Sequence, residues 1–493
     1  MRAWQAATLH YLARPSVALP LLAALLATQV LPLWTPTPDG AGYLSIAGSI
    51  AHGGPPTNMG SPKLHYPPGY PLLVSPLFLF SARPLLLLLV VQWLFAVAFM
   101  AGVYVWSRRW FPAGALWITA LTMANVSLWI HARTTISEIP FMALLVWTAL
   151  AADRLVDVKA ARETVCWGAL MALLVMALSM IRPVGVLLVV GYAAVVCRQA
   201  RLGRISWRRA VATTGLVGTP AAVAILALLL YEAHMAEIVG AWENVTYLHE
   251  FKAADVSLAA QLLEGLRVRG SEVGRLLVPG MFKAYARSYQ WLNINVAIFL
   301  SLSCGLAWAW WRVSRQARSA LLLMSPSYLA LYVAYPSDQG TRYLLPLLPV
   351  LVVCLWWLVG RLPKHGERWM AALVAAHLLV ALGYSVQTTV KLLPINALWP
   401  AVDALAETIR DDPRGVMLWG VPTTTREVMM LAADRNVYEA RPGGEIPTDV
   451  AWLLASADAT DRPGFVERAR SGSLKLLERA DQVSRGPAAG GKR

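Results

Sequence analysis

Charged side chains are scarce in this sequence. Only 14 % of its 493 residues are Asp, Glu, Lys or Arg, whereas 57 % are hydrophobic, and the mean hydropathy is +0.52. Soluble chains keep about a quarter of their residues charged. The composition therefore excludes a soluble globular protein and predicts a chain that lies mostly within a membrane.

Cysteine is also rare, with four residues: Cys166, Cys197, Cys304 and Cys354. All four fall within apolar segments or at their ends, and no CxxC spacing occurs. They are therefore interpreted as small buried hydrophobic residues rather than as disulfides or metal ligands. The sequence also lacks HExxH and similar ligand spacings, so no metal site and no cofactor are predicted.

Long apolar runs dominate the sequence instead. A bilayer core of about 30 Å requires about 20 apolar residues per helix, and about eleven segments approach this length. The expected spans are 16–34, 84–106, 112–130, 138–152, 164–181, 184–199, 211–231, 290–311, 319–335, 343–360 and 369–390.

Basic residues lie in alternate connections between these spans, for example Arg108, Arg109, Arg198, Arg201 and Arg315. This is the positive-inside pattern, and it predicts a cytoplasmic N-terminus. Membrane topology therefore explains the net charge of +15, and nucleic-acid binding is excluded. The fold class that follows is an α-helical polytopic membrane protein.

Three segments lie outside the cytoplasm under this topology: 35–83, 232–289 and the residues after about 391. We expect a transmembrane domain over 1–391 and a small soluble α/β domain over 392–493, because helix-like and strand-like stretches alternate in the tail. The expected elements of this tail are helices over 401–411 and 425–434 and strands over 415–420 and 450–454.

The loop 232–289 contains apolar residues at three- and four-residue spacing, which predicts an amphipathic helix. Such a helix can lie on the outer membrane surface, or it can be a solvated helix that caps the spans. The pattern leaves both interpretations open.

Asp39 follows the first expected span directly, in the stretch PDGAGY that ends at Tyr43. Small neighbouring residues leave room around its carboxylate, which can act as a general base toward an acceptor hydroxyl. The alternative is structural: Asp39 can be an interfacial anchor, or the N-cap of a helix expected over 40–51, because Asp is a favoured cap. The spacing alone does not choose between the two.

A proline-rich turn follows in the same loop, with Lys63, His65 and Tyr66 before two consecutive prolines. Such a turn resists both helix and strand. It can hold these three side chains against a head group at the bilayer boundary. The alternative is a stiff turn that only leads into the next span.

Ionisable residues also stand at the outer ends of later spans. Arg133 follows the third expected span and Glu138 opens the fourth, and ionisable groups at this depth are candidates for function. The alternative is an ion pair between these two that locks the turn. Arg182 and Arg342 offer guanidinium groups that suit phosphate binding, or they extend to the interface without a further role.

The order of these motifs resembles the GT-C glycosyltransferases, especially the branch with the bacterial lipid A aminoarabinose transferase and the protein O-mannosyltransferases. The resemblance covers roughly residues 15–360. It implies a GT-C fold in the plasma membrane (the bacterial inner membrane), with the active site on the extracytoplasmic side. The motifs that carry it are Asp39 with Tyr43, then HYPPGYPLL, ARTTISEIPF, MIRPVGVLL and GTRYLLPLLP.

The resemblance further implies an inverting transfer of a sugar from a polyprenyl-monophosphate donor to a hydroxyl of a lipid, glycan or protein acceptor. Asp39 matches the family's first-loop acid, the catalytic base, and Glu138 matches a second loop acid. No metal is implied, because cations from the protein can neutralise the leaving phosphate. Lipid-phosphate and substrate binding falls to Tyr43, Lys63, His65, Tyr66, Arg133, Arg182, Arg342 and Tyr343.

Two positions depart from the family pattern. Many relatives carry a second acid directly after the first, where this chain has Gly40. The aminoarabinose-type enzymes place a Lys directly before the proline turn, where this chain has Tyr66. Lys63 or His65 can substitute for that Lys.

Two other functions compete with this interpretation. A transporter or flippase of lipid-linked sugars would show inverted repeats and charged or broken helices at mid-membrane, whereas this sequence has no evident repeat and mostly clean apolar spans. A polymerase or ligase that uses a diphosphate-linked oligosaccharide would need the same cations but not Asp39.

Overall fold

The structure, a computed structural model, describes most of the chain between residues 14 and 480. All structural statements below concern these described residues. The positions outside them are 1–13, 32, 36, 55, 57–65, 240–256, 279–288, 336–339, 363–365, 410–411, 413–414, 420–427, 431, 433–436, 440–449, 460–461 and 481–493.

Contacts divide the chain into two compact units, and each is described by itself. The first unit comprises Met1–Leu31, Pro67–Tyr70 and Leu86–Val386, and the second comprises Pro32–Tyr66, Pro71–Leu85 and Gln387–Arg493. The predicted division of the chain at residues 391 and 392 stays a prediction.

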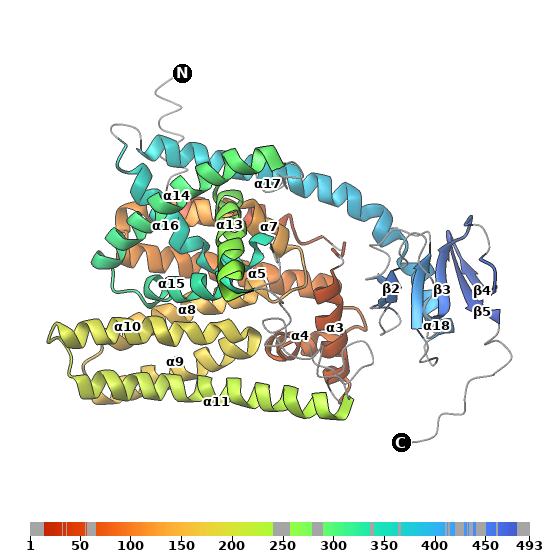
Figure 1. The fold of residues 1–493 in the computed structure, drawn as a ribbon, viewed down its shortest axis with the longest axis horizontal. Helices are drawn as coiled ribbons and strands as arrows, with labels where there is room; N and C mark the ends of the chain where they lie inside the picture. Colours follow the sequence, from red (N-terminus) through yellow and green to blue (C-terminus); the bar gives the residue numbers. More distant parts are fainter. Residues whose placement is uncertain are drawn as a thin grey trace. The chain divides into compact units, whose positions relative to one another are not determined.

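The first unit is a bundle of apolar helices (Figure 1). Each expected span overlaps a helix or a pair of consecutive helices. The bounds are α2 (Pro15–Ala27), α5 (Leu85–Trp110), η2 (Pro112–Gly114), α6 (Ala115–Ala124), α7 (Val126–Ala132), α8 (Glu138–Asp157), α9 (Ala161–Ile181), η3 (Pro183–Val186), α10 (Leu187–Arg201), α11 (Trp207–Val239), α13 (Leu258–Leu277), α14 (Tyr289–Gln316), α15 (Ala320–Ala334), η6 (Gly340–Leu347), α16 (Leu348–Val359) and α17 (Gly366–Ala397).

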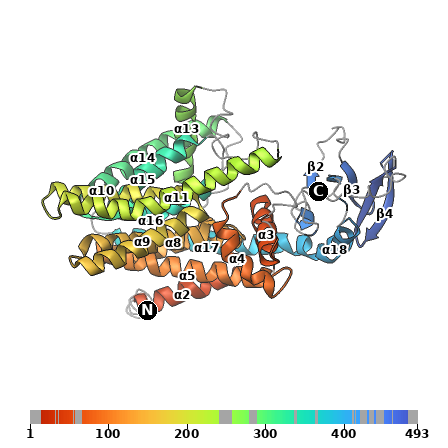
Figure 2. The same cartoon turned by 90° about the horizontal axis from the view of Figure 1, so that it is seen from below.

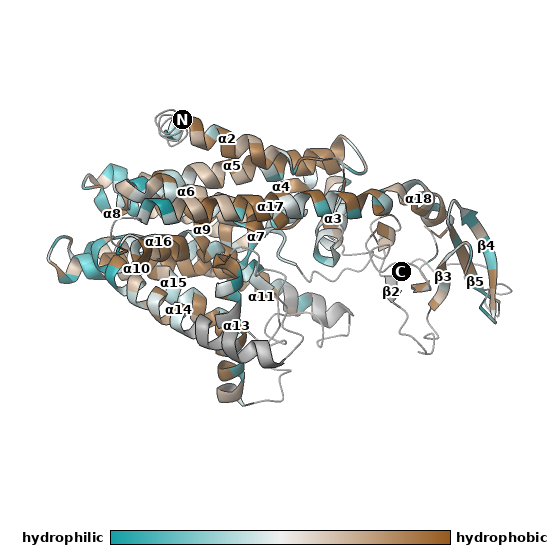
Figure 3. Ribbon diagram, turned by 90° about the horizontal axis from the view of Figure 1, so that it is seen from above, coloured by the Kyte–Doolittle hydropathy of each residue, from teal (hydrophilic) through white to brown (hydrophobic). Residues whose placement is uncertain are grey.

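Seven helices in the described part of the chain are long and apolar enough to cross a membrane, or eight if the bent pair of α6 and α7 is one span. Figure 3 shows hydrophobic residues along α5, α9, α16 and α17 and hydrophilic residues where α8 and α10 end. The protein is therefore an integral membrane protein. Eleven crossings and the cytoplasmic N-terminus stay predictions.

The third expected span is broken in the middle. Its two helices, α6 and α7, are bent by 57° at Asn125, whose backbone is extended. The Asn125 side chain accepts a hydrogen bond from the backbone N–H of Ser127 at 3.0 Å and so caps α7. The helix α7 ends at Ala132, and the residues from Arg133 to Glu138 that follow it are buried within the bundle.

The helix α13 confirms the amphipathic helix predicted within 232–289. It runs across α14 and α15 rather than along them (Figures 1 and 2). A Cβ at Gly265 would lie 2.0 Å from the carbonyl oxygen of Val333, so α13 meets the end of α15 in a close backbone contact. Leu263 and Leu266 of α13 are exposed.

The second unit joins the region between Pro32 and Leu85, apart from Pro67–Tyr70, with the distant C-terminal stretch from Gln387. It contains α3 (Pro38–Ala51), the rest of α4 (Gly69–Val74), η1 (Ser75–Leu79) and α18 (Trp399–Thr408). The Trp34 backbone exchanges two hydrogen bonds with the Asn396 side chain, at 2.9 and 3.1 Å, and the Trp34 ring packs on Trp399 at 5.6 Å. Arg83 lies over Trp399 and pairs with Asp403.

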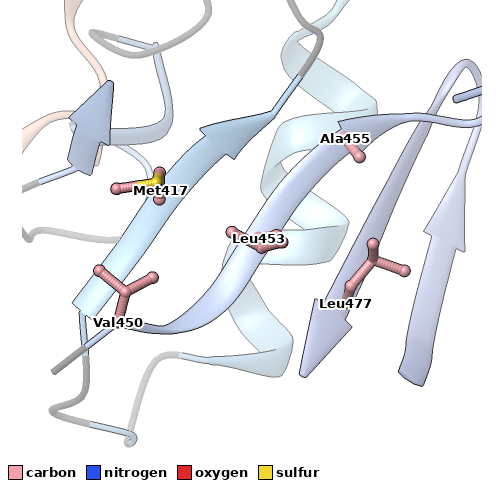
Figure 4. Packing of buried hydrophobic residues seen from close by; sticks show 5 residues of the cluster. All are labelled: Met417, Val450, Leu453, Ala455 and Leu477. Carbon is pink, nitrogen blue, oxygen red and sulfur yellow. The ribbon is translucent and has the colours of Figure 1, made fainter. Parts of the chain in front are cut away.

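A five-stranded sheet in the tail has the strand order β2-β1-β3-β5-β4. The strand β1 pairs in parallel with β2 and β3, whereas β5 pairs in antiparallel fashion with β3 and β4. The bounds are β1 (Gly415–Trp419), β2 (Val437–Glu439), β3 (Val450–Ser456), β4 (Phe465–Ser471) and β5 (Leu474–Arg479). Figure 4 shows the core on one face of the sheet, formed by Met417, Val450, Leu453, Ala455 and Leu477.

The small α/β unit predicted for the tail is therefore confirmed. The expected helix over 401–411 corresponds to α18, and the strands expected over 415–420 and 450–454 correspond to β1 and β3. The helix expected over 425–434 lies mostly outside the described residues. The strands β2, β4 and β5 escaped prediction, and β4 reads FVERARS, whose mainly polar side chains give no strand signal.

Candidate active site

A buried carboxylate in the first unit contacts two arginines from other parts of the bundle. Glu138, the first residue of α8, is fully buried. Its Oε1 atom lies 2.9 Å from Arg182 Nη1 and 2.7 Å from Arg342 Nε. Three of the predicted site residues therefore meet. The sequence also allowed an ion pair between Arg133 and Glu138. In the structure, Glu138 instead pairs with Arg182 and Arg342.

The position of Arg182 follows from the proline after it. A helix cannot continue through Pro183, and proline also forces the preceding residue into an extended conformation. The helix α9 accordingly ends at Ile181, and Arg182 has φ −149° and ψ 123°. The extended Arg182 turns its side chain to Glu138, where only 11 % of it is exposed.

The position of Arg342 follows from the short 3-10 helix η6. This helix starts at Gly340, whose φ of +62° favours glycine. The residues that flank Arg342 are both held: the Thr341 hydroxyl lies 3.2 Å from the Ser127 hydroxyl, and the Tyr343 carbonyl accepts a hydrogen bond from Tyr328 at 2.9 Å. Arg342 is thereby fixed from both sides.

Tyr343, also a predicted site residue, lies between the two arginines. Its ring centroid is 4.8 Å from the Arg182 guanidinium carbon and 5.4 Å from that of Arg342. Phe141 of α8 lies 5.8 Å from the Arg182 guanidinium. Cation–π contacts of this kind stabilise a guanidinium away from water. We call Glu138, Arg182, Arg342 and Tyr343 the arginine cluster.

His131 is a neighbour of the arginine cluster that was not among the predicted site residues. Its Nδ1 lies 2.6 Å from the Ser127 carbonyl oxygen, so in the neutral ring Nδ1 carries the proton and Nε2 is an acceptor. Electrostatic interactions join it to Glu138, Arg182 and Arg342. Its place seven residues before Glu138 was the signal in the sequence.

The proline turn braces the loop that carries Glu138. Gly69 lies so close to the end of α9 that a Cβ would be 2.5 Å from the carbonyl carbon of Met180. The buried Gln92 amide donates to the Tyr70 hydroxyl at 3.0 Å and to the Ile136 carbonyl at 2.8 Å. Gln92 also escaped prediction, although a single amide within an apolar span is a recognisable signal.

Arg133 lies apart from these contacts. Its side chain is 2 % exposed, and Nη1 donates to the Ser385 carbonyl of α17 at 3.1 Å. Within the described residues, Nε and Nη2 of Arg133 have no hydrogen-bond partner. Burial lowers the pKa of this guanidinium below its usual value. A buried guanidinium with unused N–H donors can bind an anion.

Asp39 belongs to the second unit, where it contacts Tyr66. The Tyr66 hydroxyl donates to Asp39 Oδ1 at 3.0 Å, and the ring of Tyr66 packs against that of Tyr43 with centroids 4.6 Å apart. The N-cap of α3 is Thr37, whose hydroxyl accepts from the Gly40 N–H at 3.0 Å. The alternative role of Asp39 as the cap is therefore wrong.

Lys63 and His65 lie outside the described residues. Within the described ranges, no group of three His, Cys, Asp or Glu side chains gathers in a way that could hold a metal ion. The predictions that no metal and no cofactor are needed stay predictions.

The sequence matches no family model, and it matches no curated protein sequence. Its fold, however, is similar to that of solved structures. One is ArnT from Cupriavidus metallidurans bound to undecaprenyl phosphate, with a TM-score of 0.54 and 12 % identity over 94 % of this chain and 97 % of that chain. The apo state of the same protein has a TM-score of 0.51, again at 12 % identity, over 97 % of this chain and 99 % of that chain.

The oligosaccharyltransferase from Archaeoglobus fulgidus, in complex with Zn and sulfate, is also similar. Its TM-score is 0.51 and its identity 12 %, over 89 % of this chain and 67 % of that chain. At this identity the likeness concerns the fold and not the chemistry. The protein therefore has the GT-C fold, as the order of its sequence motifs predicted.

Proposed function

We propose that the protein is an inverting glycosyltransferase that moves a sugar from a polyprenyl-monophosphate carrier to an acceptor hydroxyl on the extracytoplasmic side of the membrane. The observation that carries this proposal is the arginine cluster. Two mostly buried guanidinium groups contact one fully buried carboxylate at the end of apolar helices. Such a site suits an anionic head group whose lipid chain lies among the helices.

The proposed reaction places the cations at the leaving group. The acceptor oxygen attacks C1 of the sugar and forms a new glycosidic bond, while the bond from C1 to the phosphate oxygen breaks. The phosphate leaves with both electrons of that bond. Arg182 and Arg342 stabilise the charge that develops on it, because fixed cations act strongly where water is excluded. Glu138 holds the two guanidinium groups in place before the donor binds.

Asp39 is proposed as the general base of this reaction. Its carboxylate would take the proton from the acceptor hydroxyl as the new bond forms. The Tyr66 hydroxyl and the Tyr43 ring would hold the carboxylate in one orientation. Because Thr37 caps α3, the carboxylate is not needed for that purpose.

The solved structures support this choice of donor. ArnT from Cupriavidus metallidurans shares the fold and was solved with undecaprenyl phosphate bound. We infer that this chain also takes a polyprenyl phosphate, with Arg133, Arg182 and Arg342 as phosphate ligands. The acceptor is a lipid, glycan or protein hydroxyl.

Purification in mild detergent, followed by mass spectrometry of the lipids that copurify, tests the donor. A polyprenyl monophosphate, bare or with one sugar, is expected. A diphosphate-linked oligosaccharide would favour a polymerase or ligase instead and would reduce Asp39 to a structural role. Transbilayer movement of the intact lipid-linked sugar without transfer would identify a flippase.

A thermal-shift assay with undecaprenyl phosphate tests the cations. A ligand that binds only the folded state raises its stability by about 2.7 kcal/mol at 100 times Kd. We expect a large upward shift of Tm in the wild type and a small one in Arg342→Ala. Arg361→Ala is the control, because Arg361 contacts the Trp357 ring and not the arginine cluster. Equal shifts in all three proteins would contradict the assignment.

A further inference from the structure

The helix α13 contains a buried ion pair that the proposed reaction does not use. Arg269 Nη1 lies 3.1 Å from Glu272 Oε1, and the two side chains are 4 % and 0 % exposed. Both face the bundle, whereas Leu263 and Leu266 of the same helix are exposed. The pair is therefore turned toward the interior.

The ion pair reaches the end of α15 through a tyrosine. Glu272 Oε2 lies 2.6 Å from the Tyr332 hydroxyl. The Arg269 guanidinium lies 4.5 Å from the Tyr332 ring centroid, and its Nη2 donates to the Tyr335 carbonyl at 3.3 Å. One turn of α13 therefore contacts the hydroxyl and the ring of Tyr332 and the backbone carbonyl of Tyr335.

Tyr332 continues the connection to η6. Its hydroxyl also lies 2.6 Å from the carbonyl oxygen of Gly340, so its single proton can go to Glu272 or to Gly340. The Tyr343 ring packs edge-on against Tyr332 and Tyr335, with centroids 5.9 and 5.6 Å away. These contacts hold Gly340 and Tyr343, and Arg342 lies between these two residues in the sequence.

We propose that Arg269 and Glu272 are positioning residues for Arg342, with Tyr332 as the link between α13 and η6. This inference rests on the proposed function, in which Arg342 is a phosphate ligand. The inference assigns a role to α13, although none of the contacts described above joins α13 to Glu138 or Asp39. The arginine cluster is then preorganised partly from α13.

Packing alone does not require this ion pair. Well-packed apolar residues in place of a buried ion pair are often neutral or stabilising. The docking of α13 is already supplied by the close contact at Gly265 and by Gln261, whose amide donates to the Ala334 carbonyl at 2.6 Å. The specific effect of the pair is to orient Tyr332, and through it the start of η6.

Tyr332→Phe tests the link most cleanly, because it keeps both the ion pair and the ring. Hydrogen–deuterium exchange of the full-length protein in detergent measures the effect. Backbone amides of 340–347 are expected to exchange at least about fivefold faster, as the loss of one net hydrogen bond implies. Tyr192→Phe is the matched control, because Tyr192 is also a buried tyrosine but belongs to α10.

A double-mutant cycle tests whether the effect passes through Arg342. The measured quantity is the Kd for undecaprenyl phosphate. Tyr332→Phe is expected to raise this Kd about fivefold in the wild-type background and less than about twofold in the Arg342→Ala background, because coupled residues are not additive.

The two readouts separate the failure of this inference from that of the proposed function. Unchanged exchange over 340–347 in Tyr332→Phe, or the same change in Tyr192→Phe, would overturn the positioning role. Equal effects of Tyr332→Phe in both backgrounds would overturn it as well. Wild-type protein that does not bind undecaprenyl phosphate would instead refute the proposed function, and the exchange experiment would still decide whether α13 positions η6.

Discussion

Arg342 Nε lies 2.7 Å from Glu138 Oε1, and this carboxylate is fully buried. The two residues come from motifs that are far apart in the sequence. The same oxygen also contacts Arg182. One carboxylate therefore fixes two guanidinium groups, and its first role in the folded protein is to offset their positive charge where little water reaches them.

Glu138→Gln is expected to destabilise the protein by about 3–5 kcal/mol, because it removes a fully buried carboxylate from two mostly buried guanidinium groups. The measurement is Tm by differential scanning fluorimetry in detergent. Glu467→Gln is the control, because the pair of Glu467 with Arg470 is exposed and is worth about 1 kcal/mol or less. A Tm for Glu138→Gln as high as that of the control would show that the cluster is not held by its charge.

Asp39→Asn is expected to lower the rate of sugar transfer about 100-fold or more, the usual contribution of a general base, with Tm and lipid affinity unchanged. Tyr66→Phe keeps the ring contact with Tyr43 but removes the hydrogen bond to Asp39, so a loss of about tenfold is expected. Asp458→Asn, in an exposed turn, is the control carboxylate. Full transfer activity in Asp39→Asn would refute the proposed base.

Arg133→Met is expected to raise Tm and to weaken binding of undecaprenyl phosphate at least about tenfold. The guanidinium is buried with two nitrogen atoms unbonded among the described residues, so its removal relieves the folded protein of an uncompensated charge. Charged hydrogen bonds to a phosphate are worth about 1.5–3 kcal/mol. A lower Tm together with unchanged lipid affinity would mean that Arg133 serves the fold alone.

Gly69→Ala is expected to destabilise the protein by about 1–3 kcal/mol, because the new methyl group would press on the backbone of Met180. The shift of α9 should also displace Arg182 and reduce transfer. Gly215→Ala is the matched control, since nothing lies within 4 Å of its Cβ position in α11. Its Tm should stay the same or rise slightly. Similar Tm losses in both variants would exclude the close contact as the cause.

Several parts of this architecture could be predicted from the sequence because their signals are local. The apolar length of each span predicts a helix whatever its neighbours are. Pro183 alone ends α9 and sets the conformation of Arg182.

Other features depend on contacts that are distant in the sequence. The pairing of Glu138 with Arg182 and Arg342, instead of with Arg133, depends on how α8, α9 and η6 pack. The role of Gln92 depends on two partners, Tyr70 and Ile136, that no periodicity connects. No local pattern could therefore reveal either arrangement.

The arginine cluster also bears on the release of the product. Under the proposed reaction, the donor is a phosphodiester with one negative charge, whereas the product is a phosphate monoester that can carry two. Guanidinium groups hold a doubly charged phosphate more tightly than a singly charged one. The same two guanidinium groups that stabilise the leaving phosphate would then also slow the departure of the spent lipid carrier.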